Sequence, residues 1–183
     1  MSSSFPWPST PSSGWKAAFH KRKRFLVNAG LSLAAFIAVA APATERYTIA
    51  IDASEIRCIE DYSVFIVDYF NTELERGAIY AFSAEGLEPF FDDGQPLAKY
   101  LVGMPGDAIE ITSDQRVLIN DVEVADTLAS AHHLDMTPSD FVGKGVIGEG
   151  EYWFMGDTPE SFDSRYWGSV GRDQILGRAH GIF

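Results

Sequence analysis

The sequence predicts a mainly β protein of antiparallel strands, preceded by a single N-terminal transmembrane helix. The first observation is an uncharged apolar stretch, residues 25–43, directly after the basic run "KRKR". A helix of this length spans about 30 Å, the thickness of a membrane's hydrocarbon core. The second is a series of short β-branched and aromatic runs separated by turn residues, all beyond position 44. That later part shows no internal repeat and no sustained helical periodicity.

The apolar stretch predicts three regions of the chain. Because positive charge tends to stay in the cytoplasm, residues 1–24 are expected to be a disordered, basic cytoplasmic tail. Residues 25–43 form the anchor, and residues 44–183 form one exported domain. The alternative is a cleaved signal peptide, since "AVAAPA" offers small residues for a cut. The length of the stretch and Pro42 beside that cut favour a retained signal anchor.

The charge of the exported part excludes one class of partner. All 26 acidic residues follow position 44, where nine Lys or Arg remain, so this part carries a net charge of −17. Such a surface repels phosphate backbones, and nucleic-acid binding is therefore not expected. His132 and His133 form the one pattern that invites a metal. Neighbours on an extended chain point to opposite faces, however, so a solvated loop is the better interpretation, and neither metal nor cofactor is expected.

The first strands follow from local patterns. Residues 63–70, "SVFIVDYF", are β-branched and aromatic, and residues 78–82, "AIYAF", follow a turn. Residues 88–96 are expected to form a loop with a tight turn. Residues 97–104, "LAKYLVGM", are the next strand, which ends before the Pro-Gly pair at 105–106.

The remaining elements follow in order. Two runs then alternate between apolar and polar residues. In the second, Asn120-Asp121 is a turn pair and predicts a hairpin. Beyond them the periodicity fades into a polar loop, and two more strands end the chain. These elements are the strand 108–112, the hairpin 116–125, the loop 126–150 and the strands 151–157 and 177–183.

Two segments carry more than turn chemistry. In "KYLVGMPGD", Lys99 lies within an apolar strand, where burial disfavours a charged amine and equips it as a general base. The alternative is a lysine that snorkels from an edge strand. In "GDTPESFDSRYWGSV", Asp163 and Arg165 are two residues apart, so on an extended backbone they face the same way and suit a salt bridge.

The chain has a single cysteine, Cys58. Outside the membrane it has no partner for an intramolecular disulfide. It is therefore a buried small hydrophobe, an intermolecular link or a reactive thiol, of which the first is the commonest.

Together the anchor, "RGAIYAF", "KYLVGMPGD" and "GDTPESFDSRYWGSV" resemble the signal peptidase I family of membrane-anchored serine/lysine-dyad peptidases. The short last motif and the small size are more similar to its conjugative-transfer (TraF-type) branch. The resemblance implies a signal-peptidase-like antiparallel β-fold in a bacterial inner membrane, with a periplasmic peptidase domain. It also implies an exported pre-protein substrate, such as a pilin or transfer protein.

The resemblance assigns roles residue by residue. Lys99 matches the general base, and Ser161 matches the serine that orients it. Gly156 and Asp157 match the start of the last motif, and the triplet Asp163, Ser164 and Arg165 matches the residues that brace the site. The turn after the lysine strand is matched by Gly103, Pro105, Gly106 and Asp107. The sequence departs from the family at Ala78, Tyr100 and Thr158, where aspartate, arginine and asparagine are usual.

The nucleophile motif aligns only with "CIEDYSVFIVD", which puts Cys58 on the catalytic serine. The resemblance thus implies a Cys58–Lys99 dyad, because a thiol can serve as the nucleophile in place of the serine hydroxyl. The family's usual oxyanion hydroxyl is absent, since Ile56 stands two residues before Cys58. Ser63 or Ser54 is the alternative nucleophile. A different alternative is an inactive binding or scaffold protein of the transfer apparatus.

Overall fold

The structure, a computed structural model, describes residues 14–52 and 57–183. The chain divides into two units between Thr44 and Glu45. Ser54 and Ile56, which the sequence analysis singled out, lie outside the described residues.

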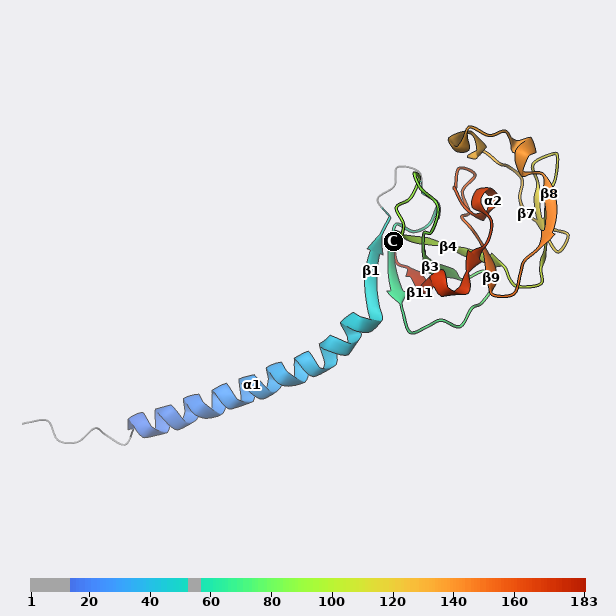
Figure 1. The fold of residues 1–183 in the computed structure, drawn as a ribbon. Coiled ribbons are helices and arrows are strands. Elements are labelled where there is room, and N and C mark those ends of the chain that lie inside the picture. The colour runs from blue at the N-terminus through green and yellow to red at the C-terminus, as the bar shows by residue number, and fades with distance from the viewer. Residues whose placement is uncertain (1–13, 53–56) are drawn as a thin grey trace, which may run out of the picture. The chain divides into compact units, whose positions relative to one another are not determined.

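The first unit contains helix α1, Gly14–Arg46 (blue in Figure 1), except for the last two residues of the helix, which belong to the second unit. The segment Arg22–Arg46 of this helix contains an 18-residue window with a mean hydropathy of 1.9 and is long and apolar enough to cross a membrane. The helix extends beyond the apolar stretch at both ends. Residues 14–24 were expected to be part of a disordered tail, but they are helical. A helix once nucleated propagates through good helix formers such as Lys and Arg.

The second unit consists of two antiparallel sheets and short helical turns. The seven-stranded sheet has the order β1-β2-β11-β3-β4-β9-β10, and the four-stranded sheet has the order β7-β6-β5-β8. The strands are β1 Tyr47–Ile51, β2 Val64–Asp68, β3 Ile79–Ser83, β4 Pro96–Gly103, β5 Ala108–Ile111, β6 Val117–Ile119, β7 Val122–Ala125, β8 Gly143–Val146, β9 Glu151–Met155, β10 Val170–Gly171 and β11 Ile175–Gly181. The helical turns are Ala131–Leu134, Pro138–Phe141, α2 Ser164–Trp167 and Arg172–Gln174. The mainly antiparallel β prediction with one apolar N-terminal helix is confirmed.

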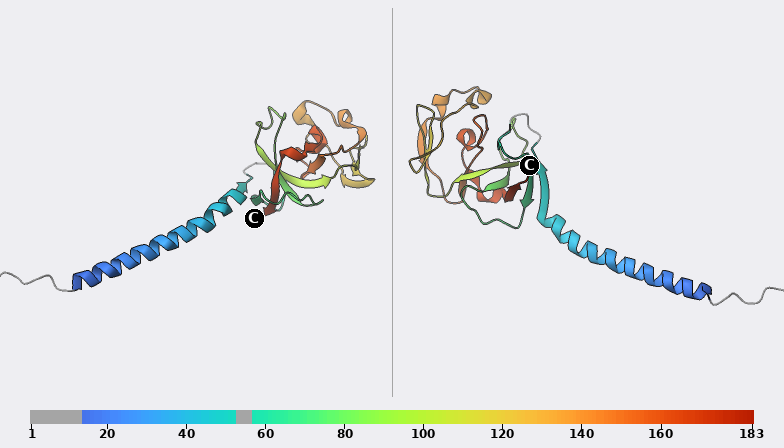
Figure 2. Two further views of the ribbon diagram at one scale, coloured as in Figure 1. Left: turned by 60° about the horizontal axis from the view of Figure 1, so that its bottom comes forward. Right: turned by 180° about the vertical axis from the view of Figure 1, so that it is seen from behind.

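Long-range pairing changes three details of the sequence-based prediction. Strand β11, the last in the chain, is not at an edge of the sheet but lies between β2 and β3. Strand β1 was not expected at all, and it pairs with β2 along its whole length. The polar loop 126–150 contains β8, whose Gly and Lys residues carry little strand signal and which forms only by pairing with β5. Figure 2 shows the four-stranded sheet to one side of the larger one.

The hairpin between β6 and β7 is confirmed. Asn120 and Asp121 both have left-handed backbones, with φ of 51° and 64°. Two consecutive positive φ values are what a two-residue type I′ turn requires, and Asn and Asp tolerate them better than most residues.

The core packs around β4, an interior strand of the large sheet. Tyr80, Phe82, Leu101 and Phe154, from β3, β4 and β9, are fully buried, and the rings of Phe82 and Phe154 stack at 4.8 Å. Strand β4 pairs with β3 on one side and β9 on the other. Residues of β4 are therefore held on a rigid element, which is where a functional site gains precision.

Candidate active site

Lys99 is buried in the centre of β4. Its side chain is only 2 % exposed, so it does not snorkel from an edge. Its Nζ donates a hydrogen bond to the Ser161 Oγ at 3.1 Å. Among the described residues no carboxylate lies within ion-pair distance of this amine, so its partner is a neutral hydroxyl and not a counter-ion.

Gly156 lies against both Ser161 and Cys58. A Cβ added at Gly156 would overlap the Ser161 Oγ and the Cys58 carbonyl oxygen. Only glycine therefore allows the segment after β9 to approach both residues this closely. This contact brings Cys58 to the same few residues that hold the Lys99 amine.

Cys58 lies in a segment that is fastened to residues 156–158 by three hydrogen bonds. The Asp157 N–H donates to the Cys58 carbonyl at 3.1 Å. The Thr158 hydroxyl donates to the Arg57 carbonyl at 2.7 Å, and the Glu60 N–H donates to the Asp157 Oδ1 at 2.8 Å. Cys58 itself is half-buried and makes no disulfide. Its backbone is thus positioned while part of the residue stays accessible.

The triplet 163–165 holds the segment 156–161 in place through hydrogen bonds. Asp163 accepts hydrogen bonds from the Nε and Nη2 of Arg165, both at 2.8 Å, and from the Gly156 N–H at 3.0 Å. Arg165 also donates to the Ser161 carbonyl at 3.0 Å. The predicted salt bridge is present, although Arg165 lies in α2 and Asp163 caps that helix, so the extended backbone assumed for the pair is wrong.

Both charges of this pair are removed from solvent. Asp163 is 0 % exposed and Arg165 is 3 % exposed. Burial lowers the pKa of the Arg165 guanidinium, but the hydrogen bond and charge of Asp163, with smaller contributions from Tyr166 and Cys58, raise it overall. Ser164 completes the brace, since its Oγ accepts a hydrogen bond from the Phe154 N–H in β9 at 2.9 Å.

The turn after β4 links the two sheets. Gly106 has a left-handed φ of 87°, and the Asp107 Oδ2 accepts a hydrogen bond from the Met104 N–H at 2.6 Å. The same carboxylate pairs with Arg76 at 2.8 Å and accepts a hydrogen bond from Asn120 at 2.6 Å. The role of Arg76 was missed in the sequence, because the "RGAIYAF" pattern gives no sign of which carboxylate it meets.

The three departures from the family pattern have different surroundings. Thr158 takes part in fastening the Cys58 segment, as described above. Tyr100 is near Asp157, Tyr62 and Asp61, and its pKa is raised first by burial and then by these groups. Ala78 packs at the margin of the core beside Tyr80.

Of the two alternative nucleophiles, only Ser63 is described. Its Oγ donates to the carbonyl of Phe183 at 3.2 Å, at the start of β2. The hydroxyl is thus engaged with the C-terminal residue. The side chain of Ser63 thus contacts Phe183, whereas the Cys58 segment is bonded to Asp157 and Thr158.

An extended chain was expected to point His132 and His133 to opposite faces. The structure shows instead that their rings lie close together. They lie in the helical turn Ala131–Leu134, with ring centroids 4.1 Å apart. The His132 Nδ1 is 2.8 Å from the Ala129 carbonyl. No cluster of three His, Cys, Asp or Glu side chains suited to a metal occurs in the part of the chain that the structure describes.

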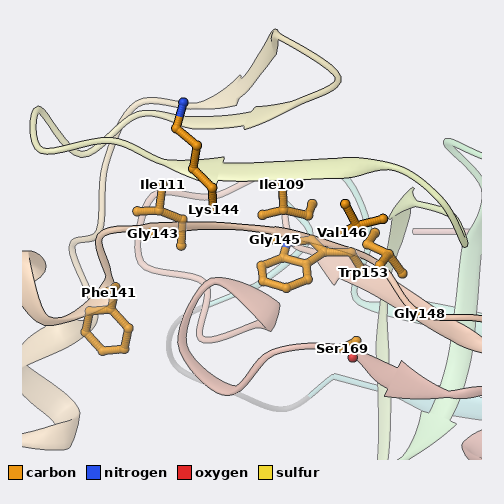
Figure 3. A pocket seen from close by; sticks show the side chains of 11 residues that line it. Ile109, Ile111, Phe141, Gly143, Lys144, Gly145, Val146, Gly148, Trp153 and Ser169 are labelled. Atoms are coloured by element: carbon orange, nitrogen blue, oxygen red, sulfur yellow. The ribbon is translucent and has the colours of Figure 1, made fainter.

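Two hollows lie outside this site. One, of about 330 Å³, is lined by Tyr62, Ala78, Tyr100 and residues of β11. The other, of about 280 Å³, lies on the four-stranded sheet between β8 and Trp153 (Figure 3). Neither is lined by Cys58, Lys99 or Ser161.

The fold and the site define a β protein with a buried lysine, oriented by a serine hydroxyl, next to a fastened cysteine segment. This is an arrangement suited to a hydrolase that uses a lysine as its base. The family described as "Signal peptidase, peptidase S26" matches residues 22–183. The chain belongs to this signal peptidase family.

The chain is also similar to individual proteins. The chain is 26% identical over 114 residues to a probable signal peptidase I-2 of Synechocystis sp., covering 62% of this chain and 50% of that protein. It is 28% identical over 120 residues to the conjugal transfer protein TraF of Agrobacterium fabrum, covering 66% of each. A signal peptidase I of Enterococcus faecalis V583 aligns with a TM-score of 0.37 and 27% identity, over 58% of this chain and 96% of that one. The chain spans about half the length of the first of these relatives.

Proposed function

We propose that the chain is a signal peptidase-type endopeptidase that removes leader segments from exported proteins, with the Cys58 thiol as nucleophile and Lys99 as general base. The observation that carries this proposal is the buried Lys99 amine, held 3.1 Å from the Ser161 Oγ. The segment that positions Ser161 also fastens the Cys58 backbone. A base and a nucleophile on one rigid framework are what covalent catalysis requires.

The proposed reaction proceeds through a thioester. The Lys99 Nζ accepts the thiol proton while the Cys58 Sγ attacks the carbonyl carbon of the scissile peptide bond. The C–N bond then breaks, and the leaving amine takes the proton from Lys99. Water attacks the thioester and gives a proton to Lys99, the C–S bond breaks, and that proton returns to the thiolate. Each turnover thus consumes one water molecule and restores the enzyme.

An open strand edge supports binding of an extended substrate. The register between β4 and β9 ends at the Tyr100–Met155 pair. The first part of β4, which leads to Lys99, pairs with β3 and has no β9 partner on its other side. A substrate strand added there would carry its peptide bonds past the Lys99 amine.

The setting of the reaction is also part of the proposal. The basic run at 21–24, at the N-terminal end of the candidate span, supports an inner-membrane anchor with the second unit in the periplasm. Similarity to a protein named conjugal transfer protein TraF supports a substrate from a conjugative transfer or pilus system.

The test is processing of a pre-protein from the same conjugation system by the full chain in membranes. Wild type is expected to release the shortened product, and Cys58→Ala and Lys99→Ala are expected to abolish it. Cys58→Ser tests whether the site accepts a hydroxyl. Lys144→Ala is the matched control, since Lys144 has a 73 % exposed side chain on β8.

Two outcomes contradict the proposal in different ways. Cleavage by Cys58→Ala at the wild-type rate would remove the thiol from the reaction and direct attention to Ser63 or Ser54. A wild-type chain that binds the pre-protein without ever cutting it would instead indicate a binding or scaffold protein.

A further inference from the structure

Phe162 stands between Ser161, whose hydroxyl accepts the hydrogen bond from Lys99, and Asp163, which pairs with Arg165. Its own side chain carries no polar group. Among the described residues, the rings of five others have their centroids 5.0 to 6.3 Å from that of Phe162. We call these six rings the Phe162 cluster; its members are Phe90, Phe91, His133, Phe162, Tyr166 and Trp167.

The Phe162 cluster joins three segments that are far apart in the chain. Helix α2, which follows Phe162, supplies two of its rings. Phe90 and Phe91 come from the loop 84–95, which connects β3 and β4 of the seven-stranded sheet. His133 comes from the helical turn that follows β7 of the four-stranded sheet. A loop from each sheet therefore meets the candidate site at this one side chain.

Hydrogen bonds strengthen the attachment on the side of the four-stranded sheet. Ser130 is 1 % exposed, and its Oγ donates to the Glu160 carbonyl at 2.7 Å. The Ser130 N–H donates to the Tyr166 hydroxyl at 3.0 Å. The Arg165 Nη1 donates to the Thr127 carbonyl at 3.2 Å. On this side the segment of the candidate site is held by polar contacts as well as by rings.

The loop between β3 and β4 is attached by aromatic contacts. The Phe90 ring lies 5.0 Å from that of Phe162, and the Phe91 ring lies 5.9 Å from that of Trp167, edge to face. Phe90 is 40 % exposed, so solvent reaches part of the ring that contacts Phe162. Aromatic pairs at these separations prefer particular relative orientations, and they therefore restrict the direction of a ring as well as its place.

The direction of the Ser161 hydroxyl depends on the backbone that Phe162 continues. The Ser161 N–H donates to the Thr158 carbonyl at 3.1 Å, and the Ser161 carbonyl accepts from Arg165 at 3.0 Å. The hydroxyl itself meets Lys99 at 3.1 Å. Because Phe162 is the next residue, a shift of its ring turns the peptide that carries Ser161. A misplacement of about 1 Å in a catalytic framework can cost about 100-fold in rate.

We propose that Phe162 is a positioning residue. The loop 84–95 holds its ring through Phe90, and this contact keeps Ser161 directed at Lys99. The kinetic consequence rests on the proposed function, whereas the coupling between the loop and the site is a property of the fold. The inference gives Phe90, a residue outside the proposed dyad, an effect on the reaction.

The kinetic test compares ring variants of the full chain in membranes, with the same pre-protein as above. Phe162→Ala is expected to lower kcat about tenfold with little change in KM, since it moves a group that acts on the lysine and not on the substrate. Phe162→Tyr, which keeps the ring, is expected to retain most of the rate, and Phe162→Leu is not. Phe90→Ala is expected to lower kcat several-fold. Phe70→Ala is the matched control, because Phe70 is a 68 % exposed phenylalanine in another turn, beside Arg46.

A double variant tests whether the two phenylalanines act together. In the Phe162→Ala background, Phe90→Ala is expected to cause no further loss of kcat, because the ring that Phe90 holds is already absent. Losses that multiply would mean that Phe90 acts elsewhere, and this would overturn the proposal. A wild-type rate in Phe162→Leu would show that apolar volume suffices, and it would overturn the role of the ring.

A second measurement needs no cleavage and separates this inference from the proposed function. Amide hydrogen exchange of residues 156–163 is expected to become several-fold faster in Phe162→Ala and in Phe90→Ala, with exchange in the β6–β7 hairpin unchanged. Unchanged exchange at 156–163, or an equal rise in the hairpin, would overturn the inference whether or not the chain cuts a substrate. Locally faster exchange in a chain that never cuts would support the coupling and contradict only the peptidase.

Discussion

The hydrogen bond from Lys99 to Ser161 joins side chains from segments far apart in the chain. A lysine side chain has a flexible four-carbon stem, so its amine needs a partner to keep one direction. Ser161 supplies that partner without bringing a charge, and it is itself fully buried. In the proposed reaction it is a positioning residue, since it acts through the lysine.

Ser161→Ala is expected to slow processing about tenfold while the protein stays folded. The change removes one hydrogen bond, worth about 1 to 1.5 kcal/mol, from the group that transfers the proton. The loss is expected in kcat with little change in KM, because the hydroxyl does not contact the substrate. Ser161→Thr, which keeps a hydroxyl, should recover part of the rate.

The control is Ser169→Ala, at an exposed serine that follows α2 in the chain. An equal loss of rate in that variant, or an unchanged rate in Ser161→Ala, would rule out the positioning role.

The segment from Gly156 to Arg165 acts as one element although it contains only a single turn of helix. Asp163 caps that turn, accepts the Gly156 N–H and pairs with Arg165, which in turn holds the Ser161 carbonyl. Hydrogen bonds in a buried network of this kind strengthen one another. The shape of the site therefore depends on an ion pair outside the proposed Cys58–Lys99 dyad.

Asp163→Asn is expected to lower the free energy of unfolding by about 3–5 kcal/mol, because it leaves the Arg165 charge buried without its counter-charge. The measurement is the midpoint of denaturant unfolding at unchanged slope. Asp114→Asn is the matched control. Asp114 and Arg116 are also two residues apart and paired at 2.8 Å, but their side chains are 61 % and 46 % exposed.

The exposed pair is expected to contribute at most about 1 kcal/mol. Similar losses of unfolding free energy in the two variants would show that burial does not account for the contribution of the Asp163–Arg165 pair to stability.

The two sheets of the second unit meet around Asp107. Its carboxylate receives hydrogen bonds from the turn after β4 and from Asn120 in the β6–β7 hairpin, and it pairs with Arg76 just before β3. Burial raises the pKa of this carboxyl, but the hydrogen bonds from Met104, Asn120 and Arg76 outweigh it, and the pKa lies below its usual value.

This shift predicts how stability depends on pH. A carboxyl whose folded pKa lies below its unfolded value of about 3.9 contributes its full stability above that pH and loses it as the pH falls through the folded pKa. The wild-type free energy of unfolding is therefore expected to fall more steeply below about pH 4 than that of Asp107→Asn, by at most about 1.4 kcal/mol per pH unit.

Asp126→Asn, at an exposed carboxyl, is the control for this comparison. Identical acid slopes for wild type and Asp107→Asn would contradict the stabilising role of the ionised carboxylate.

The candidate site was predictable from sequence in its parts but not in its assembly. The local pattern around Lys99 indicated a strand, and the positive φ values of the hairpin followed from Asn120-Asp121. The membership of Ser161 and Asp163 in the site came from a motif resemblance. Burial of Lys99, which separates a site lysine from a snorkelling one, depends on pairing with β3 and on the distant segment that carries Ser161, and no local pattern contains that information.

The sequence by itself determined the features that depend on near neighbours: the apolar helix, most of the strands, the hairpin turn and the acidic charge of the second unit. Side-chain period, turn chemistry and net charge are local properties, so they can be read along the chain. Only the tertiary structure decided where β11 inserts, that β8 exists, which carboxylate Arg76 meets, and that Gly156 lies against both Cys58 and Ser161. These depend on hydrogen bonds and packing between segments far apart in sequence, whose partners are selected only when the whole sheet forms.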